Sequence, residues 1–120
     1  MTKFDVSNNL LQANGGKALA AGLKGNQAIT ELNIASNYLG IQGRASNSDM
    51  SGVIAISDAI PTMGALVRLT ISGDERYYDN GWKDPAAVTI EASMTEADFS
   101  RKGLGASGAI MLAAFLPKCQ

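Results

Sequence analysis

The sequence predicts an α/β solenoid in which short strands and helices alternate in stacked turns. Strand-like segments open at residues 1, 29, 66 and 94, so their spacings are 28, 37 and 28 residues. Self-similarity at a period of about 20 to 50 residues is the signature of repeat architectures. Helix-like segments rich in alanine and leucine follow the first and last of these strands. The whole chain, 1–120, is therefore expected to form one domain of four turns.

The second turn, residues 29–65, carries the clearest pattern. Leu32 and Ile34 alternate with polar residues, as expected of a strand with one buried face. Asn37 follows as a residue suited to turning the chain. The polar residues 42–49 predict a surface loop before the helix, and this loop is either part of a binding rim or a neutral insertion.

The first turn, residues 1–28, repeats this order. Its strand is expected to start at the first residue, with Phe4 facing the core. Gly15-Gly16 indicates a tight bend of the backbone before a helix over residues 17–24. Gly25 is expected to end that helix, because glycine readily adopts the left-handed conformation found there.

The third turn, residues 66–93, departs from the pattern after its strand. Asn80-Gly81 lies between aromatic residues and is a signal for a hairpin turn. Residues 88–92 alternate with period two and include β-branched side chains, so they predict a further strand. A β-hairpin excursion is therefore expected where the other turns have a helix.

The fourth turn, residues 94–120, is predicted to return to the strand–helix order. Its strand is expected over residues 94–100, with Phe99 toward the core. Residues 108–116 predict the helix, and Pro117 is expected to end it because proline cannot donate a backbone hydrogen bond.

These motifs resemble a known family. The pattern LxxLxLxxNxLGxxG, a helix of the form GAxxLAxAL and the period of 28 residues are similar to leucine-rich repeats of the ribonuclease-inhibitor-like class. The resemblance covers four turns and is weakest in the third. It implies a horseshoe with a parallel sheet on the concave side, helices on the convex side and a role in binding other macromolecules. It also implies that Asn9 and Asn37 hydrogen-bond backbone groups in the loops.

Composition argues against several classes of protein. Ten basic and eleven acidic residues nearly cancel, whereas a nucleic-acid surface needs a basic stripe. No apolar run is long enough to insert across a bilayer, and no signal peptide opens the chain, so an intracellular location is the default expectation. A fragment of a longer extracellular protein would carry its signal elsewhere.

The chemistry of the side chains predicts a protein that is not an enzyme. There is no histidine, which removes the commonest general base and metal ligand. The single cysteine, Cys119, excludes an internal disulfide. We therefore predict no catalytic residue, no cofactor and no metal site.

Outward-facing positions of the strands predict a row of alternating charge on the concave face. Equivalent positions in neighbouring strands lie about 4.8 Å apart. Each basic residue then has an acidic neighbour, which supports strand register rather than binding of a ligand of one sign. This charge ladder is predicted to consist of Lys3, Glu31, Arg68 and Glu96.

Two surfaces are candidate interaction sites. The end turns are expected to lack caps, so their apolar faces favour end-to-end association with further copies or repeats, as a scaffold in a filament or a long solenoid. These end faces comprise Phe4, Val6, Leu11, Leu19, Phe99, Leu104, Leu112 and Leu116. The alternative is a module that recognises a protein or glycan through Tyr77, Tyr78 and Trp82, although these aromatic residues also fit a role in covering the hairpin.

Overall fold

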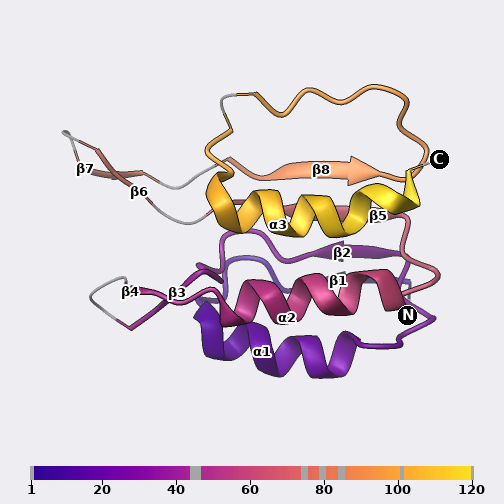
Figure 1. The fold of residues 1–120 in the computed structure, drawn as a ribbon, viewed down its shortest axis with the longest axis horizontal. Helices are drawn as coiled ribbons and strands as arrows, with labels where there is room; N and C mark the ends of the chain where they lie inside the picture. Colours follow the sequence, from indigo (N-terminus) through magenta and orange to yellow (C-terminus); the bar gives the residue numbers. More distant parts are fainter. Residues whose placement is uncertain are drawn as a thin grey trace.

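The computed structural model describes residues 2–43, 47–73, 76–78, 81–83, 86–100 and 102–119. In this part of the chain, a layer of helices covers one face of a four-stranded sheet (Figure 1). The helices are α1 (Gln12–Leu23), α2 (Ser51–Ala59) and α3 (Gly105–Phe115). The sheet has the order β1 (Lys3–Asp5), β2 (Glu31–Asn33), β5 (Arg68–Ile71) and β8 (Val88–Glu91).

The first three strands of the sheet are parallel and in the predicted register. Lys3 lies beside Glu31, and Glu31 lies beside Arg68. A helix follows β1 and another follows β2, as the crossover between parallel neighbours requires. This half of the molecule follows the alternation of apolar and polar residues in the sequence.

The predicted leucine-rich repeat solenoid, with an all-parallel sheet in a horseshoe arc, is wrong. β8 pairs with β5 in the antiparallel direction, with Arg68 opposite Glu91 and Ile71 opposite Val88, so the sheet is mixed. The radius of gyration is 13.6 Å and the extents are 40 × 31 × 20 Å. A compact globule of this length has a radius of gyration of about 13.6 Å. The chain therefore forms a small α/β globule rather than an elongated arc.

The strand predicted over residues 94–100 does not form. These residues belong to an irregular connection between β8 and α3 that runs beyond β8, on the side away from β5 (Figure 1). Val88 and Ile90 are β-branched and buried, whereas the predicted strand offered the small Ala97 as an inward residue. The segment that pairs with β5 is therefore β8, which has the stronger preference for strand structure.

Helix α1 begins earlier than predicted, so Gly15-Gly16 lies inside its first turns and not before the helix. Gly16 permits close packing of α1 against α2, because a Cβ atom on Gly16 would lie 3.2 Å from the Cα atom of Gly52 in α2. At the other end, Gly25 has φ +76°, which confirms its predicted role just after the helix. Pro117 lies in the 3₁₀ turn η2 (Leu116–Lys118) that follows α3.

Short antiparallel pairs of strands extend two of the connections. The predicted loop over residues 42–49 contains part of such a pair, β3 (Ile41–Gln42) with β4 (Asn47–Ser48). In the third turn, β6 (Arg76–Tyr78) pairs with β7 (Gly81–Lys83). A second 3₁₀ turn, η1 (Ile60–Thr62), extends α2.

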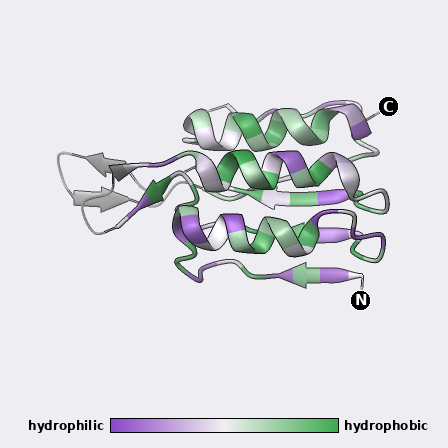
Figure 2. Ribbon diagram, turned by 60° about the horizontal axis from the view of Figure 1, so that its bottom comes forward, coloured by the Kyte–Doolittle hydropathy of each residue, from purple (hydrophilic) through white to green (hydrophobic). Residues whose placement is uncertain are grey.

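The core lies between the helix layer and the sheet, and it is densest around α2, β2 and β5. Figure 2 shows hydrophobic residues along the helices and on the strands behind them. The largest fully buried side chains are Phe115, Leu32, Ile34, Ile56, Ile60, Met63, Leu66, Leu69, Ile71, Ile90 and Met111. At the end formed by β1 and α1, four larger apolar side chains are only partly buried: Phe4, Val6, Leu11 and Leu19.

Candidate interaction site

Strand β1 lies at the edge of the sheet and has no strand partner on its outer side among the described residues. The Thr2 carbonyl accepts a hydrogen bond at 2.9 Å from an N–H of β2, and the Val6 N–H donates at 3.0 Å to a carbonyl of β2. Because successive residues of a strand direct their backbone groups to opposite edges, Lys3 and Asp5 direct theirs outward. The outer edge therefore offers two N–H donors and two carbonyl acceptors.

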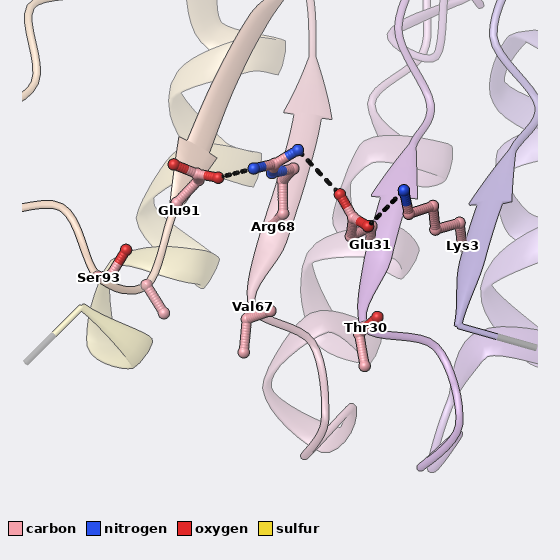
Figure 3. Close-up of a pocket in the computed structure, with 8 residues that line it drawn as sticks. Lys3, Thr30, Glu31, Val67, Arg68, Glu91 and Ser93 are labelled. Carbon is pink, nitrogen blue, oxygen red and sulfur yellow. Dashed lines mark hydrogen bonds and ion pairs between the residues drawn. The ribbon is translucent and has the colours of Figure 1, made fainter.

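A row of alternating charge crosses the exposed face of the sheet (Figure 3). The carboxylate of Glu31 lies 3.4 Å from the ammonium of Lys3 and 3.0 Å from the guanidinium of Arg68. Arg68 also forms an ion pair with Glu91. The prediction that Glu96 ends this row is wrong, because β8 occupies the position and supplies Glu91 instead.

The two basic residues of this row differ in their number of acidic neighbours. Arg68 lies between two carboxylates, and its hydrogen bond to Glu91 raises the pKa of the guanidinium above its ordinary value. Lys3 has one acidic neighbour, Glu31, and 76% of its side chain is exposed. The row thus ends at the sheet edge with a cation that has room for a further partner.

Asp5 lies on the same exposed face, two residues along β1 from Lys3. Its Oδ1 atom accepts hydrogen bonds from the Ser7 N–H at 2.9 Å and the Ser7 hydroxyl at 2.7 Å. These bonds hold the pKa of the Asp5 carboxyl below its ordinary value, with the hydroxyl as the larger cause. The edge strand therefore presents a fixed anion beside an exposed cation.

This arrangement of Asp5 and Ser7 was not predicted, although the sequence contains a signal for it. An aspartate two residues before a serine can accept hydrogen bonds from the backbone and hydroxyl of that serine. The motif occurs again at Asp49-Met50-Ser51 and Asp98-Phe99-Ser100, and the same backbone contact is present in both. Its spacing would have indicated where the chain turns.

Four of the predicted end-face residues gather at the β1 end of the molecule. They are half-buried and pack against the edge of the core: Phe4, Val6, Leu11 and Leu19. The sequence reasoning missed Leu10, which is 68% exposed and has φ +52°. We call these five side chains, with the outer edge of β1, the β1 end face.

The other four predicted end-face residues lie at the opposite side of the sheet. Phe99 belongs to the connection that precedes α3, and Leu104, Leu112 and Leu116 belong to α3 and the residues next to it. Here the carbonyl of the edge strand at Glu91 already accepts from the Met94 N–H at 3.1 Å. The two end faces are therefore not equivalent.

A buried asparagine fixes the backbone behind the β1 end face. Asn37 is 1% exposed, and its Nδ2 atom donates to the Val6 carbonyl at 3.0 Å. Its Oδ1 atom accepts from the N–H groups of Asn9 and Leu11 at 2.8 and 3.4 Å. The role of Asn37 in binding loop backbone is confirmed, and Leu10 is held between two of these contacts.

The aromatic candidate patch has a described backbone only. Tyr77, Tyr78 and Trp82 lie in β6 and β7, and their side chains lie outside the described residues. Within the part of the chain that is described, no group of three or more carboxylate, thiol or imidazole side chains could hold a metal ion. None of the described helices has the length and apolar character needed to cross a membrane.

In comparisons with protein-family models, curated proteins and solved structures, nothing matches this chain. The molecule is a two-layer α/β domain with a mixed sheet, and its likeness to leucine-rich repeats rests on sequence motifs alone.

Proposed function

We propose that this protein is a non-enzymatic interaction module that associates with further copies of itself through the β1 end face. The observation that carries the proposal is the outer edge of β1, whose outward N–H and C=O groups have no strand partner among the described residues. Unpaired strand edges are templates for pairing with another chain, and soluble proteins usually cover or charge them.

The apolar side chains around this edge support the same proposal. Phe4, Val6, Leu11 and Leu19 are each only partly covered by the rest of the chain. Leu10 is 68% exposed, which is the largest exposure among the large apolar residues of the described chain. A second copy at this end would remove these side chains from water, and burial of apolar surface drives most protein association.

The charged side chains favour binding over catalysis. Glu31 and Glu91 are engaged in ion pairs with Arg68. Hydrogen bonds from Ser7 hold the pKa of the Asp5 carboxyl below its ordinary value, which does not suit a proton donor near neutral pH. The sequence contains no histidine to serve as a general base. In the hollow over the charge row, the acidic residues Glu31 and Glu91 are already paired with basic side chains (Figure 3).

The proposal is tested by measuring mass by light scattering over a dilution series of the full chain. We expect oligomers at high concentration and a mass of 12.5 kDa on dilution. Leu10→Glu should shift dissociation to higher concentration. Ile54→Glu is a control with the same charge change, because Ile54 is likewise exposed, at 51%, but lies on α2. A wild-type chain that stays monomeric and folded at every concentration would contradict the proposal.

A further inference from the structure

We propose that two copies join through β1 as an antiparallel pair with two-fold symmetry, in which Lys3 of each copy lies opposite Asp5 of the other. This inference rests on the proposed function and specifies the partner, the strand direction and the register. It makes the assembly a closed dimer with one continuous sheet.

The backbone of the edge permits this pairing. In an antiparallel ladder, residues that face each other with their N–H and C=O groups exchange two hydrogen bonds. Lys3 and Asp5 are the β1 residues whose backbone groups point outward. Placing Lys3 opposite Asp5 of the second copy also places Asp5 opposite Lys3 of that copy. Both outward residues of each strand are then paired, with four hydrogen bonds between the copies.

The side-chain charges select this register over its neighbours. A shift of the register by two positions places either the two Lys3 residues or the two Asp5 residues opposite each other. Like charges directly opposite destabilise strand pairs, whereas opposite charges stabilise them. A shift by one position would set outward backbone groups against groups already bonded to β2. In the proposed register, the outward backbone groups form hydrogen bonds and each charged side chain lies opposite a charge of the other sign.

Both charged groups have capacity for a partner outside their own chain. The Lys3 ammonium has three N–H donors and one acidic neighbour, at 3.4 Å, and its side chain is 76% exposed. Asp5 uses Oδ1 for Ser7, which leaves Oδ2 with no hydrogen bond to any described residue. The pairing would also extend the row Lys3, Glu31 and Arg68 into the second copy without placing like charges side by side.

The apolar side chains fit the same two-fold axis. The centre of the proposed register lies at Phe4, which would face its own counterpart in a pair without backbone hydrogen bonds. Side chains are closest in such pairs, with Cα atoms about 4.5 Å apart. Phe4 is partly buried against the core, and Leu19 of α1 is partly buried on the same side of the sheet. The two cores would therefore meet along the new interface.

The opposite end of the sheet is a poorer partner for β1. Lys3 against Glu91 of another copy would also join opposite charges. However, the Glu91 carboxylate is already bound to Arg68, and the Glu91 carbonyl already accepts from Met94. The connection after β8 also runs along that side of the strand (Figure 1). A contact between different ends would grow without closing, whereas a two-fold contact stops at two copies.

Charge exchange tests the register directly. Lys3→Asp places two acidic pairs across the dimer axis, and Asp5→Lys places two basic pairs there. Each single variant should dimerise roughly tenfold or more weakly than wild type. An equimolar mixture of the two should form a mixed dimer, and the double variant K3D/D5K should dimerise close to the wild-type strength. Lys102→Asp and Asp58→Lys are controls with the same charge changes at exposed sites outside β1.

The outcomes separate this inference from the proposed function. Sedimentation equilibrium gives the masses, and circular dichroism checks that each variant is folded. A wild-type chain that is monomeric throughout would overturn the proposed function. A wild-type chain that associates, with a double variant and a mixture as weak as the single variants, would overturn the symmetric register alone. Growth of the wild type beyond a dimer would also overturn the two-fold pairing and leave self-association standing.

Discussion

The Oδ1 atom of Asn37 accepts a hydrogen bond at 2.8 Å from the backbone N–H of Asn9, which joins two successive strand–helix connections. The same side chain also binds the Val6 carbonyl at 3.0 Å, so one buried amide satisfies donors and acceptors on both sides. This contact holds the backbone from which the β1 end face is built.

Replacing Asn37 should destabilise the fold. Asn37→Ala removes the acceptor of the partly buried N–H groups of Asn9 and Leu11, and we expect the free energy of unfolding to fall by about 3 kcal/mol. Asn9→Ala is the control, because the Asn9 side chain bonds only within its own turn, at 2.8 and 3.2 Å, and is exposed. Urea unfolding of both variants gives the comparison. Equal losses for the two would contradict the bridging role of Asn37.

The contact between α1 and α2 depends on glycine. A Cβ atom on Gly52 would lie 2.6 Å from the carbonyl oxygen of Ala13, so Gly52→Ala forces the two helices apart. We expect a loss of about 2 kcal/mol in stability from this overpacking. Gly22→Ala in α1 meets no atom within 4 Å and should gain about 0.5 kcal/mol from helix propensity. Thermal unfolding should separate the two variants in opposite directions from wild type.

The identity of the last carboxylate in the charge row can be checked by substitution. Glu91→Gln removes one of the two carboxylate partners of Arg68 and should lower the urea midpoint at low salt, with a smaller effect as salt screens the charges. Glu96→Gln should leave the midpoint unchanged, because Glu96 is exposed in the connection after β8. If Glu96→Gln had the larger effect, the position assigned to β8 would be wrong.

The position of β8 also shows what the sequence could and could not predict. The strands around Leu32 and Leu69, and the register of Lys3 with Glu31 and Arg68, follow from alternation and spacing. Alternation locates a strand but does not state its direction, so the antiparallel pairing of β8 could not be derived. Residues 94–100 keep the spacing of a strand, but Thr95 is their one β-branched residue, whereas Val88, Thr89 and Ile90 are β-branched in succession.

The candidate site was predictable to a similar extent. Spacing alone placed Phe4 and Leu19 at an end face, where they are partly exposed. It gave no sign of Leu10, because a leucine with positive φ contradicts the usual backbone preference of that residue. Spacing also assigned Phe99 to a second end face equivalent to the first. Because β8 is antiparallel to β5, the surface on that side of the sheet differs from the β1 end face.

The paired hydrogen bonds of Asp49 predict a specific response to acid. The Ser51 hydroxyl and then its N–H lower the pKa of the Asp49 carboxyl from its ordinary value of 3.8. A carboxyl with a lowered pKa in the folded state contributes stability above its unfolded pKa and loses it as the pH falls through the folded pKa. Ser51→Ala should raise the pKa of Asp49, measured by NMR titration, and reduce this loss of stability in acid. An unchanged pKa in Ser51→Ala would contradict the assignment.

Leu10 combines an unfavourable backbone conformation with an exposed apolar side chain. Its φ of +52° is unfavourable for a leucine, and its side chain is 68% exposed in the single chain. Leu10→Gly relieves the strain, so the monomer should gain about 1 kcal/mol in stability. The same change removes apolar surface from the β1 end face and should weaken self-association. Leu10→Ala keeps the β-carbon and should weaken association without this gain, so comparing urea unfolding at low concentration with mass at high concentration separates the two effects. A glycine variant that associates as strongly as wild type would show that the Leu10 side chain takes no part in the contact.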